Sequence, residues 1–341
     1  MTRRQVFLFL AYTIIASLLV VGSSAHVPII GDAGTSPETA IEIEDPTKSI
    51  VVYSELHEAQ EPQYFYLHME SVTRLRITIN LPLEYEGIDF NPTLIIMGHD
   101  LGTNDTIPEY VELPSGLEAM VFESETSIPV YEGFTPSAFL VTLNLNLQVS
   151  DVDHYYLAVF DDSMGGRYSI TLGYVEIFTL EEWLLVPFSV ISIHLWEGQS
   201  LALILLPMLV IPVIGLILFQ RGFLKIVKRD NPLVWIGLVS TLFILASGAV
   251  IFMQMILATA SVGFDPQIVI TFIFGLLPFT LGFFGARLLS KADDFLDRPN
   301  AIRLFAIGII SLFVWGGYII GPLILSLISL LSLVKSFGTS K

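Results

Sequence analysis

The charged residues of this chain are divided between two parts of opposite character. Residues 26–198 hold 28 of the 33 acidic residues and only four basic ones, a net charge of −24. Beyond them lie four long apolar stretches, at 200–220, 233–256, 267–286 and 302–334. About 20 helical residues cover about 30 Å, the thickness of the hydrocarbon core of a bilayer. The sequence therefore predicts an acidic domain followed by a four-helix transmembrane bundle within 199–335.

Basic residues flank the predicted spans on one side. They lie between the first and second spans and between the third and fourth: Arg221, Lys225, Lys228, Arg229, Arg287, Lys291, Arg298 and Arg303. Because Lys and Arg near membrane segments favour the cytoplasmic side, these loops are predicted to lie inside the cell. The expected location is therefore the cell membrane, with a multi-pass topology, a lipid bilayer around the spans and the acidic domain outside.

The composition excludes several classes of function. Hydrophobic residues make up 53% of the chain and charged residues 14%, unlike a typical soluble protein. The net charge of −17 argues against a nucleic-acid partner, because phosphates require a basic surface. The chain has no cysteine, so disulfides, Fe–S clusters and cysteine-ligated zinc are excluded. A cysteine-free, acidic exported domain suits a prokaryotic cell surface.

The N-terminus has the pattern of an export signal. Arg3 and Arg4 precede an apolar run over 5–21, and Ser23 and Ala25 provide small residues at a cleavage site. We expect residues 1–25 to be a signal peptide, with an uncleaved N-terminal anchor as the alternative. Residues 26–47 are rich in proline, glycine and acids and are predicted to be a linker.

Residues 48–176 are predicted to form an extracytoplasmic antiparallel β-sandwich of about eight strands. In 74–81, for example, Leu75, Ile77 and Ile79 share one face and polar residues share the other. Such alternation is typical of a strand with one buried face. The expected strands are 49–54, 63–69, 74–81, 93–98, 118–123, 138–149, 154–160 and 167–174.

Two later segments have features that predict particular helices. Thr179 and Glu182 have the spacing of a capping box, so a helix over 179–197 is predicted. Its terminal tryptophans favour an interfacial amphipathic helix at the headgroup level, and the alternative is a final core helix of the sandwich. The stretch 302–334 is too long for one straight span, and Gly321-Pro322 should kink it. We predict one span with an extension, an outside C-terminus and a tail over 336–341.

Candidate ligand sites in the acidic domain are few. Asp161 and Asp162 begin a predicted hairpin loop whose oxygens could bind calcium, although ordinary turn chemistry explains the same residues. Asn104 begins a glycosylation sequon in a loop that we expect to be exposed. Six histidines are scattered through the acidic part, and none pairs at helical metal-site spacing: His26, His57, His68, His99, His154 and His194.

The predicted spans contain small residues rather than ionisable ones. Gly275 and Gly282 fall on one helical face, and Gly317 and Gly321 have the GxxxG spacing that lets helices approach closely. These glycines indicate packing within the bundle or docking of another membrane subunit. The first three spans carry no ionisable residue, and away from the span ends Gln254 is their one strongly polar side chain. Such a set argues against a transporter or a membrane enzyme.

The acidic domain resembles the prepeptidase C-terminal domain, a small β-sandwich of secreted microbial proteins. The similarity lies in Gln63–Leu67 with Arg74–Ile79, in Asn91–Asp100, and in the closing hairpin His154–Phe160 and Gly165–Leu172. The resemblance implies an accessory module linked to binding or secretion, with no catalytic residues to carry over. It covers about 110 residues, and 101–149 is longer than the family pattern requires.

The sequence contains no recognised nucleophile, phosphate-binding or metalloprotease motif, so no enzymatic activity is expected. The most economical hypothesis is a non-enzymatic surface protein whose sandwich binds a surface glycan, a peptide or a neighbouring membrane protein. No cofactor is expected apart from the calcium considered above. An accessory subunit or assembly factor of a membrane complex is the first alternative, and a membrane-bound enzyme or transporter is the second.

Overall fold

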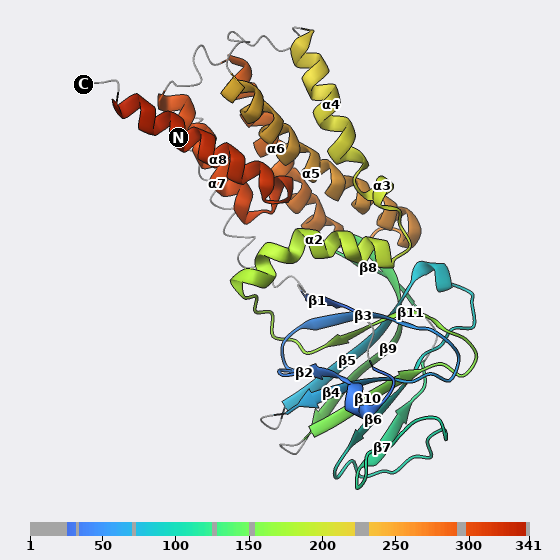
Figure 1. Ribbon diagram of the computed structural model, residues 1–341. Coiled ribbons are helices and arrows are strands. Elements are labelled where there is room, and N and C mark those ends of the chain that lie inside the picture. The colour runs from blue at the N-terminus through green and yellow to red at the C-terminus, as the bar shows by residue number, and fades with distance from the viewer. Residues whose placement is uncertain are drawn as a thin grey trace.

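The computed structural model describes residues 26–31, 34–69, 73–124, 128–149, 154–221, 232–291 and 298–338. Strands come first in the chain and helices follow (Figure 1). The predicted signal peptide lies outside the described residues, as do Lys225, Lys228 and Arg229.

Eleven strands in the described residues form two mixed sheets, which we call sheet A and sheet B. Sheet A has the order β1 (Val27–Ile30), β3 (Ile50–Leu56), β11 (Gly166–Leu172), β5 (Thr73–Pro82), β9 (Ser137–Val149) and β8 (Ile128–Glu132). Sheet B has the order β2 (Ile41–Ile43), β4 (Gln63–His68), β10 (His154–Phe160), β6 (Thr93–Gly98) and β7 (Glu118–Phe122).

The core of the sandwich lies between the two sheets. Alternate residues of the central strands are fully buried there, which is the outcome that the period-two patterns predict. From sheet A these include Leu75, Ile77 and Ile170, and from sheet B Phe65 and Leu157.

The linker and the all-antiparallel sandwich predicted from the sequence are both wrong in part. Residues 26–47 contain β1 and β2, and these strands run parallel to β3 and β4. The third unpredicted strand is β8. All three lie at sheet edges, and β1 and β8 each contain a proline, which sheets tolerate only at such positions. Short edge strands with proline leave no clear alternation, so the sequence pattern did not reveal them.

The helices occupy the C-terminal part. They are α2 (Leu180–Trp196), α3 (Leu201–Ile204), α4 (Leu206–Gln220), α5 (Pro232–Val262), α6 (Ile268–Lys291), α7 (Arg298–Phe313) and α8 (Ile320–Gly338). Short 3₁₀ turns are η1 (Pro37–Thr39), η2 (Leu83–Tyr85) and η3 (Gly316–Tyr318). Figure 1 shows α2 lying crosswise between the sandwich and the longer helices.

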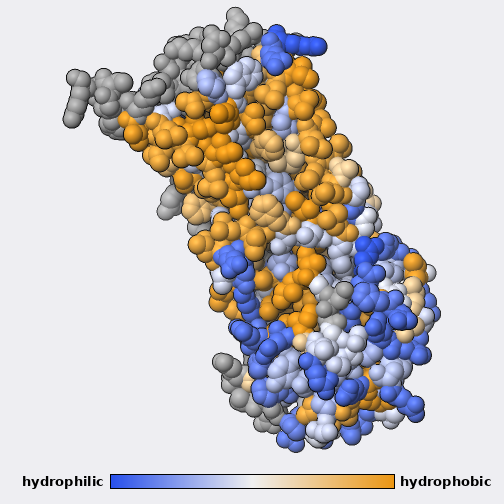
Figure 2. Space-filling view, in the orientation of Figure 1, coloured by the Kyte–Doolittle hydropathy of each residue, from blue (hydrophilic) through white to orange (hydrophobic). Residues whose placement is uncertain are grey.

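Two helices, α5 and α6, are long and apolar enough to cross a membrane by length and composition. The apolar segments of α4 and α8 are shorter. Figure 2 shows apolar residues over much of the helical surface and hydrophilic residues over much of the sandwich. The helices α4, α6 and α8 expose many large apolar side chains, among them Leu209, Val269 and Leu327.

The single kinked span predicted over 302–334 is wrong. Helix α7 ends at Phe313, and the chain reverses before α8 begins at Ile320. Positive φ angles at Trp315, Gly317 and Ile319 make this reversal. A Cβ added at Gly308 of α7 would come within 3.1 Å of Pro322 O on α8, so the two helices are packed side by side. The sequence gave no sign of the reversal because the end of α7 and the start of α8 are both apolar.

Candidate binding surface and junction site

The predicted calcium residues are used within the hairpin loop. Asp161 Oδ1 accepts hydrogen bonds from Ser163 N at 2.9 Å and Met164 N at 3.0 Å, and Oδ2 accepts one from Asn91 N at 2.8 Å. Asp162 accepts a short hydrogen bond from Tyr110. These contacts are the turn chemistry that the sequence also allowed. Among the described residues, no three His, Cys, Asp or Glu side chains are placed to hold a metal ion.

The sequon lies in a long loop that lines the edge of sheet B. Asn104 is exposed, yet its Oδ1 accepts a hydrogen bond from Ala119 N of β7 at 3.3 Å. Asp105 accepts another from Val121 N at 3.0 Å. The loop thereby occupies polar groups of edge strand β7, which would otherwise be open to pairing with another chain. This role accounts for part of the extra length of segment 101–149.

Four aromatic and imidazole rings gather on the outer face of sheet B, and we call them the sheet B patch. Tyr66 lies 4.8 Å from Tyr156 and 5.2 Å from His154, measured between ring centroids. His68 lies 4.7 Å from Tyr66 and 5.2 Å from His154. At the margin, His68 Nε2 is 2.5 Å from a carboxylate oxygen of Glu42.

The patch follows directly from strand register. Strands β4 and β10 are antiparallel neighbours, with Tyr66 opposite Tyr156 and His68 opposite His154. Phe65 and Leu157 point into the core, so the alternate residues must face outward. In the sequence the histidines are scattered, and local patterns do not predict this grouping. The repeated Tyr-x-His and His-x-Tyr spacing was the available signal, but it required knowledge of which strands pair.

The opposite sheet, sheet A, faces the helices and is fastened to α6. The Tyr131 hydroxyl donates to Thr271 Oγ1 at 2.8 Å, and Thr271 donates to Gly133 O at 2.5 Å. Gln267 Nε2 donates to Tyr131 O at 3.3 Å. We call this set of contacts the β8–α6 latch. Because Tyr131 and Thr271 are fully buried, the latch is shielded from water.

Helix α2 is fastened to the sandwich at both ends. Lys48 forms an ion pair of 2.6 Å with Glu182 in its first turn. Trp196 Nε1, in its last turn, donates to Ser54 O at 3.1 Å. Its Val186 and Ile193 are buried, while Leu180 and Leu185 are exposed. The helix therefore covers sheet A and also presents apolar residues outward, which combines features of both sequence interpretations.

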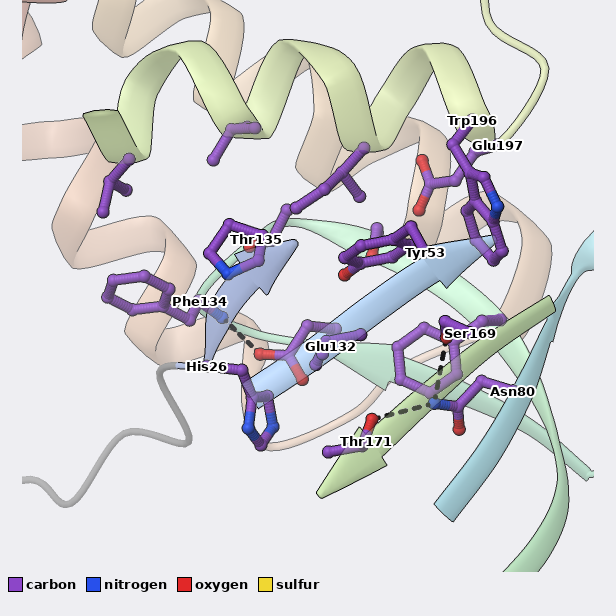
Figure 3. A pocket seen from close by; sticks show the side chains of 17 residues that line it. His26, Tyr53, Asn80, Glu132, Phe134, Thr135, Ser169, Thr171, Trp196 and Glu197 are labelled. Atoms are coloured by element: carbon purple, nitrogen blue, oxygen red, sulfur yellow. Dashed lines mark hydrogen bonds between the residues drawn. The ribbon is translucent and has the colours of Figure 1, made fainter. Parts of the chain in front are cut away.

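A cavity of about 50 Å³ lies beneath α2 against sheet A (Figure 3). Its polar lining includes His26, Tyr53, Glu132 and Glu197. Burial raises the pKa of Glu132 to about 7, although the backbone N–H of Phe134 stabilises its charged form. Burial and the charge of Arg76 lower the pKa of His26 to about 4. Burial, with the charges of Glu197 and Glu132, raises the pKa of Tyr53.

Gln254, the strongly polar residue in the interior of the predicted spans, contacts the end of α2. Its amide pairs reciprocally with that of Gln199, with N–O distances of 2.9 and 2.8 Å. Nearby, His194 Nδ1 is 2.8 Å from a carboxylate oxygen of Glu197. This polar group joins the end of α2 to α5.

The four glycines singled out in the spans all approach α5. A Cβ at Gly282 would lie 2.3 Å from Leu245 N, and one at Gly275 would lie 2.9 Å from the ring of Phe252. A Cβ at Gly321 would lie 3.0 Å from Ser240 O of α5, and one at Gly317 would lie 3.2 Å from Ile244 N of the same helix. Their lack of side chains thus permits close helix packing inside this chain.

Comparison with protein-family models finds no match to this chain, and comparison with curated proteins finds none. The resemblance of the sandwich to the prepeptidase C-terminal domain therefore stays a prediction based on residue patterns. The candidate sites are therefore defined by geometry. They are the sheet B patch on one side of the sandwich and the cavity beneath α2 on the other.

Proposed function

We propose that this chain is a multi-pass membrane protein that holds a β-sandwich outside the cell as a binding module. In this proposal α4, α5, α6, α7 and α8 all lie in the bilayer, which corrects the four expected spans to five. The large apolar side chains that these helices expose support the proposal, because a soluble protein rarely displays so wide an apolar surface.

The distribution of charge supports the proposed orientation. Arg221 follows α4, Arg287 lies near the end of α6, and Arg298 begins α7. These positions are at the helix ends far from the sandwich (Figure 1). With basic residues inside, the sandwich lies outside.

The observation that carries the binding function is the sheet B patch. Tyr66 and Tyr156 present ring surface, while His68, His154 and Glu42 supply polar groups beside it. A sugar ring has an apolar C–H face and a hydroxyl edge, so it suits this combination. The patch lies on the sheet that faces away from the helices, where the bilayer would not obstruct it. We therefore favour a surface glycan as the ligand, and a peptide is the competing outcome of the test.

The test is binding of the full chain, in a mild detergent, to arrays of glycans and of peptides. We expect glycan binding that falls at least tenfold when Tyr66 and Tyr156 are both replaced by alanine, the loss expected for about 1.4 kcal/mol. Tyr174→Ala, at an exposed tyrosine elsewhere on the sandwich, is the matched control. Binding that is unchanged by the double substitution, or that is restricted to peptides, would contradict the glycan assignment.

A second candidate, an accessory subunit of a membrane complex, is favoured by a groove between α4 and its neighbours. The groove has a volume of about 530 Å³ and is lined by apolar residues such as Ile214, Leu242 and Phe283. Purification of the chain in mild detergent would reveal a stoichiometric membrane partner if this alternative is correct. In neither case do we propose catalysis.

A further inference from the structure

A second cavity, which we call the junction cavity, lies where α2, α5, α6 and the turn after α7 meet. Its volume is about 80 Å³. Aromatic residues from distant parts of the chain surround it: Phe134, Phe274, Trp315 and Tyr318. Phe134, from the turn between β8 and β9, makes edge contacts with Phe274 at 5.7 Å and Trp315 at 5.6 Å between centroids. The cavity is thus built jointly by the sandwich and the helices.

His194 provides the cavity with an unsatisfied polar atom. The side chain is 1% exposed and lines the cavity. Its Nδ1 is bonded to Glu197 at 2.8 Å, whereas the buried Nε2 has no hydrogen-bond partner in the described part of the chain. In the neutral imidazole, a carboxylate beside Nδ1 places the ring proton on Nδ1, so that Nε2 is an acceptor. A buried acceptor left without a donor is destabilising, because it has lost the hydrogen bonds that it would make to water.

The lining offers a water molecule at Nε2 few polar partners. A buried water needs two to four polar partners. The other buried polar side chains of the lining are already engaged: Gln254 pairs with Gln199, and Ser247 bonds Gly317 N and Ile244 O. The rest of the lining is dominated by apolar and aromatic side chains. A molecule with an apolar body and one donor matches these surroundings better than water.

The backbone beside the cavity is strained. Trp315 has φ of 49° and Tyr318 has φ of 51°, and both side chains line the cavity. The following residue, Ile319, has φ of 67°, which is rare for a β-branched side chain. Such backbone conformations are strained, and they cluster at ligand sites. Here the strained turn positions the rings of Trp315 and Tyr318 against the cavity.

We propose that the junction cavity binds the hydroxyl end of a long-chain membrane alcohol or hydroxyl-bearing lipid, whose O–H donates to His194 Nε2. An ammonium group suits the cavity less well, because it brings three donors to one unpartnered buried acceptor. The partly exposed Phe274 and Val314 mark where the alkyl chain would leave toward the bilayer. The inference rests on the proposed membrane location and is independent of what the sheet B patch binds.

The test uses two photoreactive probes, hexadecanol carrying a diazirine and its methyl ether, with the purified full chain in nanodiscs. The ether has the same chain and no donor. We expect the alcohol to label peptides containing Trp315 or Tyr318 about five times more than the ether, the ratio for a hydrogen bond of about 1 kcal/mol. His194→Phe should reduce this ratio to about one. His194→Gln, which keeps an amide acceptor, should retain part of it, and His99→Phe, in an exposed loop, should leave it unchanged.

Equal labelling by the alcohol and the ether in the unmodified chain would overturn the proposal, as would labelling restricted to the groove along α4. This comparison needs no variant, so it decides even if His194→Phe fails to fold. Membrane fractionation separates the two proposals: a chain in the soluble fraction refutes the membrane location. A membrane-embedded chain that is labelled equally by the alcohol and the ether would refute only the proposed site in the junction cavity.

Discussion

Glu132 is the residue whose ionisation depends most clearly on the sandwich–α2 junction. Its pKa of about 7 lies above the usual 4.5 because burial disfavours the charge. Between about pH 4.5 and 7 the folded protein therefore binds a proton that the unfolded chain releases, so stability falls as pH rises through this window. The total loss is about 3 kcal/mol at most, and it is complete above about pH 7.

We expect Glu132→Gln to remove this loss, because the amide stays neutral and can still accept the bond from Phe134 N. The measurement is the melting temperature of the full chain between pH 5 and 8. Glu109→Gln, at an exposed loop position, controls for a change of net charge. Parallel pH curves for the unmodified chain and Glu132→Gln would show that Glu132 is ionised normally.

At the residue scale, the sequence revealed which side chains alternate but not which ones meet. Asp161 and Gln254 both stand out in the sequence, yet one partner of each, Asn91 for Asp161 and Gln199 for Gln254, lies in a distant segment. The same limit concealed the sheet B patch, because the pairing of β4 with β10 brings together His68 and His154, which are 86 positions apart in the chain (154 − 68). Cross-strand register is a long-range property that local periodicity does not encode.

The β8–α6 latch is the contact between elements that best explains how the sandwich is held. Replacing Thr271 with valine removes the bonds to Tyr131 and to Gly133 O, so we expect a loss of about 1–3 kcal/mol of stability. Denaturant unfolding of Thr271→Val, Tyr131→Phe and the double variant gives the coupling energy. Thr280→Val is the matched control, because that hydroxyl bonds only carbonyls of its own helix. Fully additive losses would rule out the latch.

The reversal between α7 and α8 should depend on Gly317. Its φ of 61° disfavours any side chain, and an added Cβ would lie 3.2 Å from Ile244 N. Gly263 has φ of 85° but nothing within 4 Å, so Gly263→Ala measures the cost of the backbone conformation alone. We expect Gly317→Ala to lower the melting temperature more than Gly263→Ala does. Equal shifts would show that the close approach to α5 is unimportant.

At the element scale, the sequence predicts the strands that have a strong pattern of side chains and misses those whose pattern is weak. The eight predicted strands correspond to β3, β4, β5, β6, β7, β9, β10 and β11, each with clear alternation or an apolar run. The short edge strands and the α7–α8 reversal were missed. A reversal inside a continuous apolar run depends on backbone angles at Trp315 and Ile319 that neither residue type favours.

For the molecule as a whole, the acidic sandwich should respond to salt. Its net charge of −24 over residues 26–198 produces mutual repulsion that mobile ions screen. We expect the melting temperature of the full chain to rise between about 0.01 and 0.5 M NaCl, a range that shortens the screening length severalfold. Calcium at matched ionic strength separates general screening from a specific site. A further gain from calcium that is lost in Asp161→Asn with Asp162→Asn would revive the metal site, and a flat response to both salts would refute the electrostatic argument.

The orientation of the whole molecule is testable because the natural chain has no cysteine. Single cysteines at Ser115, in an exposed turn of the sandwich, and at Arg221, after α4, sample the two ends of the molecule. We expect an impermeant thiol reagent to label Ser115→Cys in intact cells and to label Arg221→Cys only after permeabilisation. The opposite pattern would invert the proposed topology.

A third cysteine, added after Lys341, distinguishes the hairpin from a single kinked span. Helices α7 and α8 pack side by side, and α8 ends far from the sandwich (Figure 1). If both cross the bilayer, the C-terminus lies on the same side as the basic loops, and the added cysteine should behave like Arg221→Cys. Labelling in intact cells would instead return the C-terminus to the outside and exclude the five-helix arrangement. The same cells, permeabilised, provide the control that each cysteine can react.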